Sequence, residues 1–406
     1  MLLCCIGYLK RNSKMKNNEQ HIIPFIERLL DGAEVEWKKL GEVVQIKTGE
    51  LVSKSIIAEN LGDYPVINSG RDPLGFINIW NTDNDPIGVT SRGAGVGSIT
   101  WQEGKYFRGN LNYSVSIKDF SILNTRFLYH LLLQRQVDIQ SLCTYQGIPA
   151  LNAVNLKKLL IPIPPLSVQQ EIVRILDKFT TLEAELDAEL DCRKRQYEYY
   201  RNKLLSFDML NGGGNSLNNI FILPLGEVGE FSRNRIDSLS LNETSFVGVD
   251  NLLQNRNGKT NSKYVPSEGT LTAYQISDIL IGNIRPYLKK IWYADNNGGA
   301  SGDVLVVHII NKNILPRYLY HILADDKFFA YNMQYAKGAK MPRGNKQKIM
   351  EYKIPIPPLS EQERIVSILD KFDTLTNSIS EGLPKEIALR RKQYAHYRDR
   401  LLNFQR

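Results

Sequence analysis

One segment of the chain occurs twice, and this duplication constrains the fold more than any other feature. Residues 161–182 and 354–375 are identical at 17 of 22 positions, including Ile-Pro-Ile-Pro-Pro-Leu-Ser and Ile-Leu-Asp-Lys-Phe. A second matching pair follows, residues 193–207 and 390–404, and both contain Gln-Tyr-x-x-Tyr-Arg-x-x-Leu-Leu. A duplication this close predicts two copies of one structural unit, and two copies of a unit usually hold two related partners or domains.

The repeated segments have the apolar spacing of long helices. Apolar or aromatic residues recur every three or four positions from 172 to 207, and again from 365 to 404, which is close to a heptad pattern. Ser167, after a double proline, is predicted to be the N-cap of the first helix. Two helices with long apolar seams are expected to pack antiparallel against each other.

The second helical segment is longer than the first. The copies are 193 residues apart at the proline-rich start but 197 apart at Gln-Tyr-x-x-Tyr. The four extra residues, around 380–384, correspond to about one helical turn, or roughly 6 Å. Gly382 and Pro384 are expected to weaken or kink the helix there.

Two divergent blocks alternate with these helices. In the first block, runs 64–68, 86–90, 97–101 and 113–117 are predicted to be short strands, and 125–136 a helix capped by Asn124. Three pairs of matching segments relate the two blocks. They are Leu-Gly-Glu-Val at 40–43 and 225–228, Arg-x-Leu-Tyr-His at 126–130 and 317–321, and residues 145–149, which correspond to 336–340. The prediction is an α+β protein with a pseudo-twofold internal repeat. It comprises an N-terminal extension (1–34), mixed blocks (35–160 and 222–353), helical spacers (161–210 and 354–406) and a linker (211–221).

The bulk composition favours an anionic partner. The net charge is +8 and the pI is about 9.1, which makes nucleic acid the first candidate. The four cysteines have neither metal-ligand spacing nor a disulfide framework, and no segment reaches 18 apolar residues, so we expect a soluble, cytoplasmic protein.

Patterns that point to catalysis are weak. Gly93-Ala-Gly-Val-Gly97 resembles a nucleotide-binding loop, but a strand-like run follows where a helix should begin, so a tight turn is predicted. The five histidines are scattered and suggest no metal site. His130 and His321, in the matched helices, are expected to be structural.

Taken together, these motifs resemble the specificity (S) subunit of type I restriction-modification systems. The resemblance covers the chain from about residue 35 and rests on the doubled Ile-Pro-Ile-Pro-Pro-Leu-Ser segment, on Gln-Tyr-x-x-Tyr-Arg, and on the Leu-Gly-Glu-Val that opens each block. It implies two target recognition domains, each reading half of a split double-stranded DNA sequence. It also implies that the helices bind two methyltransferase (M) subunits, and that restriction (R) subunits join the complex. No catalytic residue, metal or cofactor is expected in this chain, because S-adenosylmethionine, ATP and Mg would belong to the partners.

DNA contacts are expected from basic and amide side chains on loops, because Lys and Arg neutralise phosphates while Arg, Lys, Asn and Gln read bases. In the first block the candidates are Lys47, Lys54, Arg92, Arg108, Asn110, Tyr145 and Gln146. In the second they are Arg233, Arg235, Asn283, Arg285, Tyr287, Lys289, Lys337, Lys340, Arg343 and Lys346. The exposed helix faces are predicted to bind the partner subunits through Arg193, Tyr199, Arg201, Arg390 and Arg398.

Two other classes of function remain open from the sequence. A scaffold could hold two partner proteins without reading DNA, and the repeat alone does not exclude it. A stand-alone nuclease would need a metal-binding carboxylate set, for which only the weak pattern of Asp85 with Glu103 and Lys105 is present.

Overall fold

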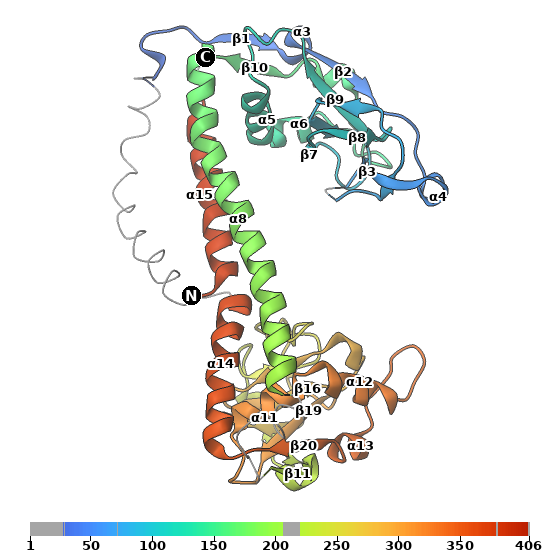
Figure 1. The fold of residues 1–406 in the computed structure, drawn as a ribbon, viewed down its shortest axis with the longest axis vertical. Helices are drawn as coiled ribbons and strands as arrows, with labels where there is room; N and C mark the ends of the chain where they lie inside the picture. The colour runs from blue at the N-terminus through green and yellow to red at the C-terminus, as the bar shows by residue number, and fades with distance from the viewer. Residues whose placement is uncertain (1–26, 28, 71, 206–219, 379–380, 405–406) are drawn as a thin grey trace. The chain divides into compact units, whose positions relative to one another are not determined.

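The computed structural model describes residue 27 and residues 29–70, 72–205, 220–378 and 381–404. Most of the expected N-terminal extension and of the linker therefore lies outside the described residues. The chain divides into two compact units, Met1–Glu185 with Ala388–Arg406, and Leu186–Ile387 (Figure 1). Each unit combines one mixed block with helical segments from both copies of the repeat.

The block of the first unit (block 1) contains two four-stranded sheets. The antiparallel sheet has the order β2 (Val44–Thr48), β9 (Asn112–Ile117), β6 (Ile87–Thr90) and β7 (Ile99–Trp101). The other has the order β4 (Phe76–Ile77), β3 (Leu61–Ile67), β8 (Lys105–Arg108) and β5 (Thr82–Asp83), and β3 runs parallel to β8. All four predicted strand runs are confirmed in kind, with ends that differ by a few residues.

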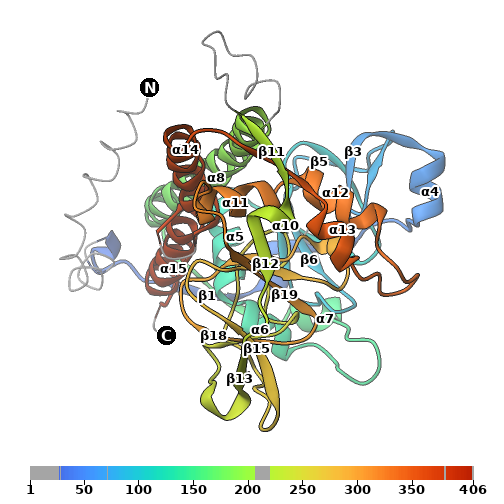
Figure 2. The same ribbon diagram turned by 90° about the horizontal axis from the view of Figure 1, so that it is seen from below.

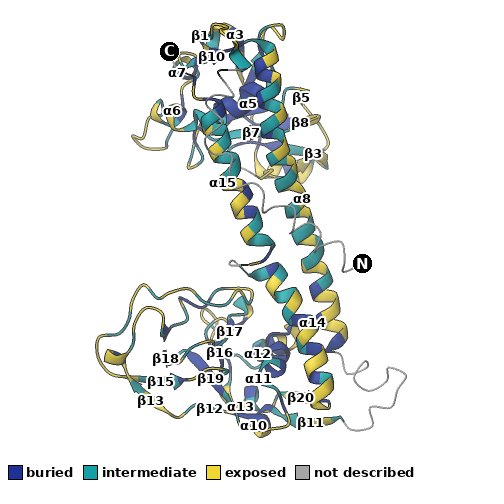
Figure 3. Cartoon of the chain, turned by 90° about the vertical axis from the view of Figure 1, so that its left-hand side faces the viewer, coloured by how far each residue is buried: buried dark blue, intermediate teal, exposed yellow. Residues whose placement is uncertain are grey.

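Short helices surround the sheets of block 1. They are α3 (Leu40–Val43), α4 (Lys54–Glu59), α5 (Thr125–Gln134), α6 (Gln136–Ser141) and α7 (Ala153–Leu156). The predicted cap of α5 is confirmed, because the Asn124 side chain accepts hydrogen bonds from the backbone N–H groups of Arg126 and Phe127. Helix α5 buries Phe127, Leu128 and Leu131 in the core of the unit (Figure 3).

The block of the second unit (block 2) repeats this architecture. Its antiparallel sheet has the equivalent order β12 (Gly229–Phe231), β19 (Val304–Ile309), β16 (Ile279–Gly282) and β17 (Ile291–Tyr293). The other sheet has the order β13 (Arg235–Asp237), β15 (Thr270–Tyr274), β18 (Gly298–Ala300) and β14 (Phe246–Val247), again with one parallel pair, β14 and β18. The helices are α10 (Leu225–Val228), η2 (Ser238–Ser240), η3 (Pro286–Leu288), α11 (Pro316–Leu323), α12 (Asp326–Gln334) and α13 (Lys346–Met350).

The first and last strands of each block pair with each other. Strand β1 (Glu36–Lys39) is antiparallel to β10 (Leu160–Ile163), and β11 (Phe221–Pro224) is antiparallel to β20 (Lys353–Ile356). The two ends of each block therefore lie side by side, and the last strand of each block leads directly into a repeated helix.

The long helices are α8 (Leu166–Leu204), α14 (Leu359–Asn377) and α15 (Leu383–Leu401). Ser167 lies inside α8 rather than capping it, because Leu166 is already helical, so the predicted N-cap was wrong. The expected weakness in the second helical segment is confirmed as a break between α14 and α15. A Cβ on Gly382 would lie only 2.3 Å from the carbonyl oxygen of Thr374, so a side chain does not fit at this break.

Helical segments pack antiparallel inside the first unit, as predicted. Phe179 of α8 stacks on Tyr397 of α15 with ring centroids 5.0 Å apart, and Arg391 pairs with Glu183 at 2.7 Å. In the second unit, Phe372 of α14 stacks on Tyr197 and Tyr200 of α8.

An aspartate of the repeated helix binds the first block. Asp177 accepts hydrogen bonds from Arg126 Nε at 2.7 Å and from His130 Nε2 at 2.8 Å. Asp177 is the aspartate of Ile-Leu-Asp-Lys-Phe, and its two donors belong to the Arg-x-Leu-Tyr-His anchor.

The second unit repeats this arrangement, with α11 lying against α14 (Figure 2). Asp370 accepts from Arg317 at 2.8 Å and from His321 at 2.7 Å. His130 and His321 are both fully buried, as expected for structural residues.

Candidate nucleic-acid interface

Two loops lie side by side at one edge of block 1. Arg92, in the turn after β6, forms a bridge with Ala150, which also bridges Thr144 across the next loop. The Gly93 N–H donates to the Pro149 carbonyl at 2.9 Å. We call residues 92–97 and 144–150 tip 1. Arg92, Tyr145 and Gln146 are exposed on it.

Block 2 has the same pair of loops. Ile284, in the turn after β16, forms a bridge with Arg343, which also bridges Lys337. The Arg285 N–H donates to the Pro342 carbonyl at 2.7 Å. We call residues 283–289 and 337–344 tip 2. The exposed side chains of tip 2 include Arg285, Tyr287, Lys337, Lys340 and Arg343.

The bridges fix the correspondence between the tips. Thr144 corresponds to Lys337, and Ala150 to Arg343. The predicted alignment of 145–149 with 336–340 therefore found the right loop but was two residues out of register. The reason is that block 2 has two more residues than block 1 between the matched histidine and this loop.

The tips differ in charge. Tip 2 carries several cations, and two of them pair with described carboxylates: Lys289 with Asp326 at 2.8 Å, and Arg343 Nε with Asp303 at 3.2 Å. Both side chains of the Arg343–Asp303 pair are about half exposed, so this pair adds little stability and leaves Arg343 accessible. Tip 1 presents Arg92 beside an uncharged tyrosine and glutamine. The tips therefore offer different chemistry on the same frame.

Several predicted DNA-binding residues lie outside both tips. Lys47 and Lys54 are exposed on β2 and α4, and Asn110 is half-buried in the turn between β8 and β9. Arg233 and Arg235 are exposed around the start of β13, and Lys346 is exposed on α13. No hydrogen bond or ion pair among the described residues joins these side chains to either tip, although Lys346 follows tip 2 by only two residues.

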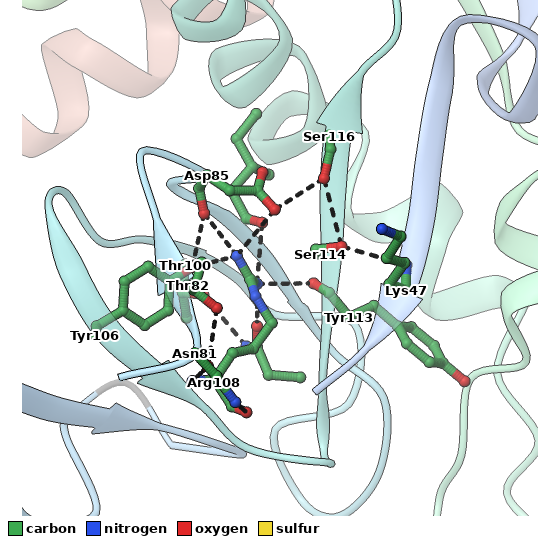
Figure 4. A network of polar contacts seen from close by, with 12 residues as sticks. Lys47, Asn81, Thr82, Asp85, Thr100, Tyr106, Arg108, Tyr113, Ser114 and Ser116 are labelled. Atoms are coloured by element: carbon green, nitrogen blue, oxygen red, sulfur yellow. Dashed lines mark hydrogen bonds and ion pairs between the residues drawn. The ribbon is translucent and has the colours of Figure 1, made fainter. Parts of the chain in front are cut away.

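Arg108 does not fit its predicted role, because its side chain lies in the interior of block 1 (Figure 4). The guanidinium donates to Asn112 Oδ1 at 2.6 Å, to the Asp85 carbonyl at 2.6 Å and to the Tyr106 hydroxyl. Burial lowers the pKa of Arg108 and raises the pKa of Tyr106 to about 12. Arg108 is a structural residue in this fold. Asn283 is a second correction, since its side chain is also buried and cannot reach a base edge.

Block 2 has an apolar cluster where block 1 has the Arg108 network. The parallel strand pairs equate Arg108 with Ala300. Ala300 is buried with Leu280, Trp292 and Val304. At this equivalent position the interior of block 1 is polar and charged, whereas the interior of block 2 is apolar.

The predicted partner-binding residues are only partly exposed. Tyr199 is 59% exposed, and Arg193 is half-buried beside Glu189 at 2.7 Å. Arg398 pairs with Asp399 at 2.9 Å and covers the Tyr394 ring. Arg201 and Arg390 are buried, so the prediction of an exposed face was wrong for them. Arg201 turns inward toward Asp325, 3.7 Å away, because it lies on the side of α8 that faces block 2.

The described residues contain no group of three or more His, Cys, Asp or Glu side chains placed to hold a metal ion. Among the same residues, no helix is long and apolar enough to cross a membrane.

Comparison with known proteins agrees with this architecture. The type I restriction modification DNA specificity domain matches twice, at residues 33–191 and 222–389. A Haemophilus influenzae protein with the provisional name of a type I restriction enzyme specificity subunit is 34% identical over 96% of this chain and 100% of its own length. A type I restriction enzyme specificity subunit of Escherichia coli is 32% identical over 94% of this chain and 97% of its own.

A solved structure shares the fold. The crystal structure of the type I restriction-modification S subunit from M. genitalium aligns with a TM-score of 0.61 at 20% identity, covering 92% of this chain and 98% of that one. At this level of identity the likeness concerns the fold. With both family matches and two relatives of near-equal length, the chain belongs to the type I restriction-modification DNA specificity subunit family.

Proposed function

We propose that this chain is the DNA-reading subunit of a type I restriction-modification complex. Each block reads one half of a bipartite double-stranded DNA target, the repeated helices set the spacing, and the chain itself has no catalytic role. The observation that carries this proposal is that the same backbone arrangement occurs twice in the chain. The two blocks share the order of their antiparallel sheet and one pair of bridged loops, yet the side chains on those loops differ.

The loops have the chemistry that DNA binding requires. Exposed Lys and Arg neutralise phosphates, while arginine, amide and aromatic side chains contact bases. Tip 2 places Lys337, Lys340 and Arg343 on one loop, with the left-handed Gly338 (φ +104°) allowing a tight bend. Within each tip the loops are tied by backbone hydrogen bonds, which limits the conformational entropy lost on binding.

The repeated helices are proposed to dock two methyltransferase subunits, through which restriction subunits join. Tyr199 and the accessible parts of Arg193 and Arg398 support such a surface. S-adenosylmethionine, ATP and Mg would be held by those partners, and the complex would act in the cytoplasm.

The direct test is a methylation map. The chain is co-purified with its methyltransferase partner, and adenine methylation is mapped across a genome. The proposal expects methylation at one split motif, two short fixed sequences around a spacer of constant length. Methylation without such a motif would overturn it.

A second test separates DNA reading from a scaffold that never touches DNA. Replacing Lys340 and Arg343 with alanine should weaken DNA binding and lower the slope of log affinity against log salt by about 2, since each lost phosphate contact removes about 0.9. The matched control replaces Lys263 and Lys312, two exposed lysines of the same unit outside tip 2. A scaffold predicts no change in either variant, whereas a stand-alone nuclease predicts metal-dependent cleavage by the chain alone.

A further inference from the structure

Arginine and lysine occupy backbone positions in tip 2 that favour glycine. Arg285 and Lys289, on either side of η3, have φ of +52° and +51°. This left-handed conformation is strained for residues with a Cβ. In block 1 the equivalent positions, set by the matched strand registers of β6–β7 and β16–β17, are Gly93 (φ +97°) and Gly97 (φ +76°). Block 1 thus makes the same turn with glycines, while block 2 keeps two long cationic side chains despite the strain.

The two cationic side chains differ in what they contact. Lys289 Nζ pairs with Asp326 at 2.8 Å at the start of α12. Arg285 is exposed, and its side chain makes no hydrogen bond or ion pair with any described residue. Its backbone is fixed, however, because its N–H donates to Pro342 at 2.7 Å and the next bridge joins Ile284 to Arg343.

Asn255, Arg256 and Asp326 hold the Lys289 end of this turn, and we call their contacts the clamp. Asn255 and Arg256, also left-handed, donate their backbone N–H groups to the carbonyls of Leu288 and Lys289, both at 3.0 Å. The Arg256 side chain donates to the Ala324 carbonyl at 2.5 Å and pairs with Asp326. Asp326 therefore binds Lys289 and Arg256 together and fixes the turn against α12.

We propose that Arg285 is a specificity-determining residue of block 2 that reads a guanine, and that Asp326 is a positioning residue for it. An unpaired arginine guanidinium is the group that most often reads guanine, through O6 and N7 in the major groove, and here it is carried on a fixed backbone. The clamp orients the turn before DNA arrives. The residue of block 1 that corresponds to Asp326 is Arg135, if the blocks are aligned so that His130 matches His321. The contacts that hold this turn are therefore a feature of block 2 and have no counterpart carboxylate in block 1. This inference rests on the proposed function.

The test replaces Arg285 with glycine, the residue that block 1 uses at this position. R285G relieves the backbone strain, so the thermal stability of the complex with its methyltransferase should stay the same or rise. Its methylation should nevertheless lose preference at one guanine of one half-site by about fivefold or more, the lower end of what one base contact supplies. The other half-site serves as the internal reference.

Ser277→Gly is the matched control, because it relieves the same left-handed strain (φ +75°) at a residue of block 2 that lies outside tip 2 and outside the contacts that hold the turn. D326N should reduce the same guanine preference, and D326E should restore part of it. Glu351→Gln is the control for the Asp326 variants. It removes the ion pair of Glu351 with Lys348, and the Glu351 side chain is 56% exposed, against 57% for Asp326, so it should not change the guanine preference.

The outcomes are distinct. If wild type methylates a split motif and R285G keeps the full motif, Arg285 does not determine specificity. The same conclusion follows if R285G weakens both half-sites equally. If the affected base is not guanine, the assignment of the base is wrong. A wild-type complex that methylates no split motif would overturn the proposed function together with this inference.

Discussion

Gln169 and Gln362, which stand 193 positions apart, make the same three hydrogen bonds. Gln169 accepts from the Asn124 N–H at 2.8 Å and donates to the carbonyls of Ile122 and Pro164. Gln362 accepts from the Leu315 N–H at 2.8 Å and donates to Asn313 and Pro357. Both side chains are fully buried. The repeated motif is therefore shaped by how a helix binds its block.

Replacing Gln169 with leucine should destabilise the first unit. Leucine has a similar size but leaves one N–H and two carbonyls buried without partners, so we expect a loss of about 2–5 kcal/mol. The measurement is chemical denaturation followed by circular dichroism. Gln170→Leu is the control, since Gln170 is exposed on the next position of α8; equal effects in both variants would contradict the explanation.

Acid should destabilise the first unit through His130, because protonation would place a charge on a buried side chain. Burial lowers the pKa of His130, so the native state holds it neutral, with Nε2–H donating to Asp177. A histidine whose pKa is lower in the folded state stabilises the fold above its unfolded pKa of about 6.5, and that stability is lost below it. Burial opposes ionisation of Asp177, but hydrogen bonds from His130 and Arg126 outweigh it and lower the pKa of Asp177.

We therefore expect the free energy of unfolding to fall between pH 7.5 and pH 5.5, and to fall less in His130→Gln. Glutamine keeps a donor toward Asp177 and removes the titrating group. An unchanged pH dependence in that variant would assign the effect to other groups.

Replacing Arg108 with methionine should destabilise block 1 by about 3 kcal/mol, because it strands hydrogen-bond acceptors in the interior. The structural role predicts a lower melting temperature with little change in the salt dependence of DNA binding at low temperature. A phosphate contact would produce the reverse pattern, with a smaller salt slope and unchanged melting.

Deleting one turn from α8 should change the DNA spacer before it changes either half-site. Four residues correspond to about 6 Å of helix, or about two base pairs of B-DNA. Methylation mapping of the deletion complex measures both quantities at once. A changed half-site with a constant spacer would show that the helices do not set the distance.

The sequence predicts the frame of this protein better than its contacts. The Asn124 cap located α5, and the four extra residues with Gly382 and Pro384 located the break between α14 and α15, because these signals depend on local chemistry. Residue type misassigned Arg108, since an arginine beside glycines suggests a loop until Asp85 and Asn112 are found around it. The clamp at Asp326 was missed because no sequence pattern marks a left-handed Arg256, although the Asp325-Asp326 pair after a matched helix was a visible signal.

The paired first and last strands of each block have a consequence for how such genes can change. Exchange of DNA within the repeated segments that encode β10 and β20 would deliver a whole block, complete with its own closing strand. Exchange inside a block would combine strands that do not match at this interior position and set Arg108 among the apolar neighbours of Ala300. Under the proposed function, new target sequences should therefore arise by replacement of entire blocks, while substitutions on the tips would adjust each one.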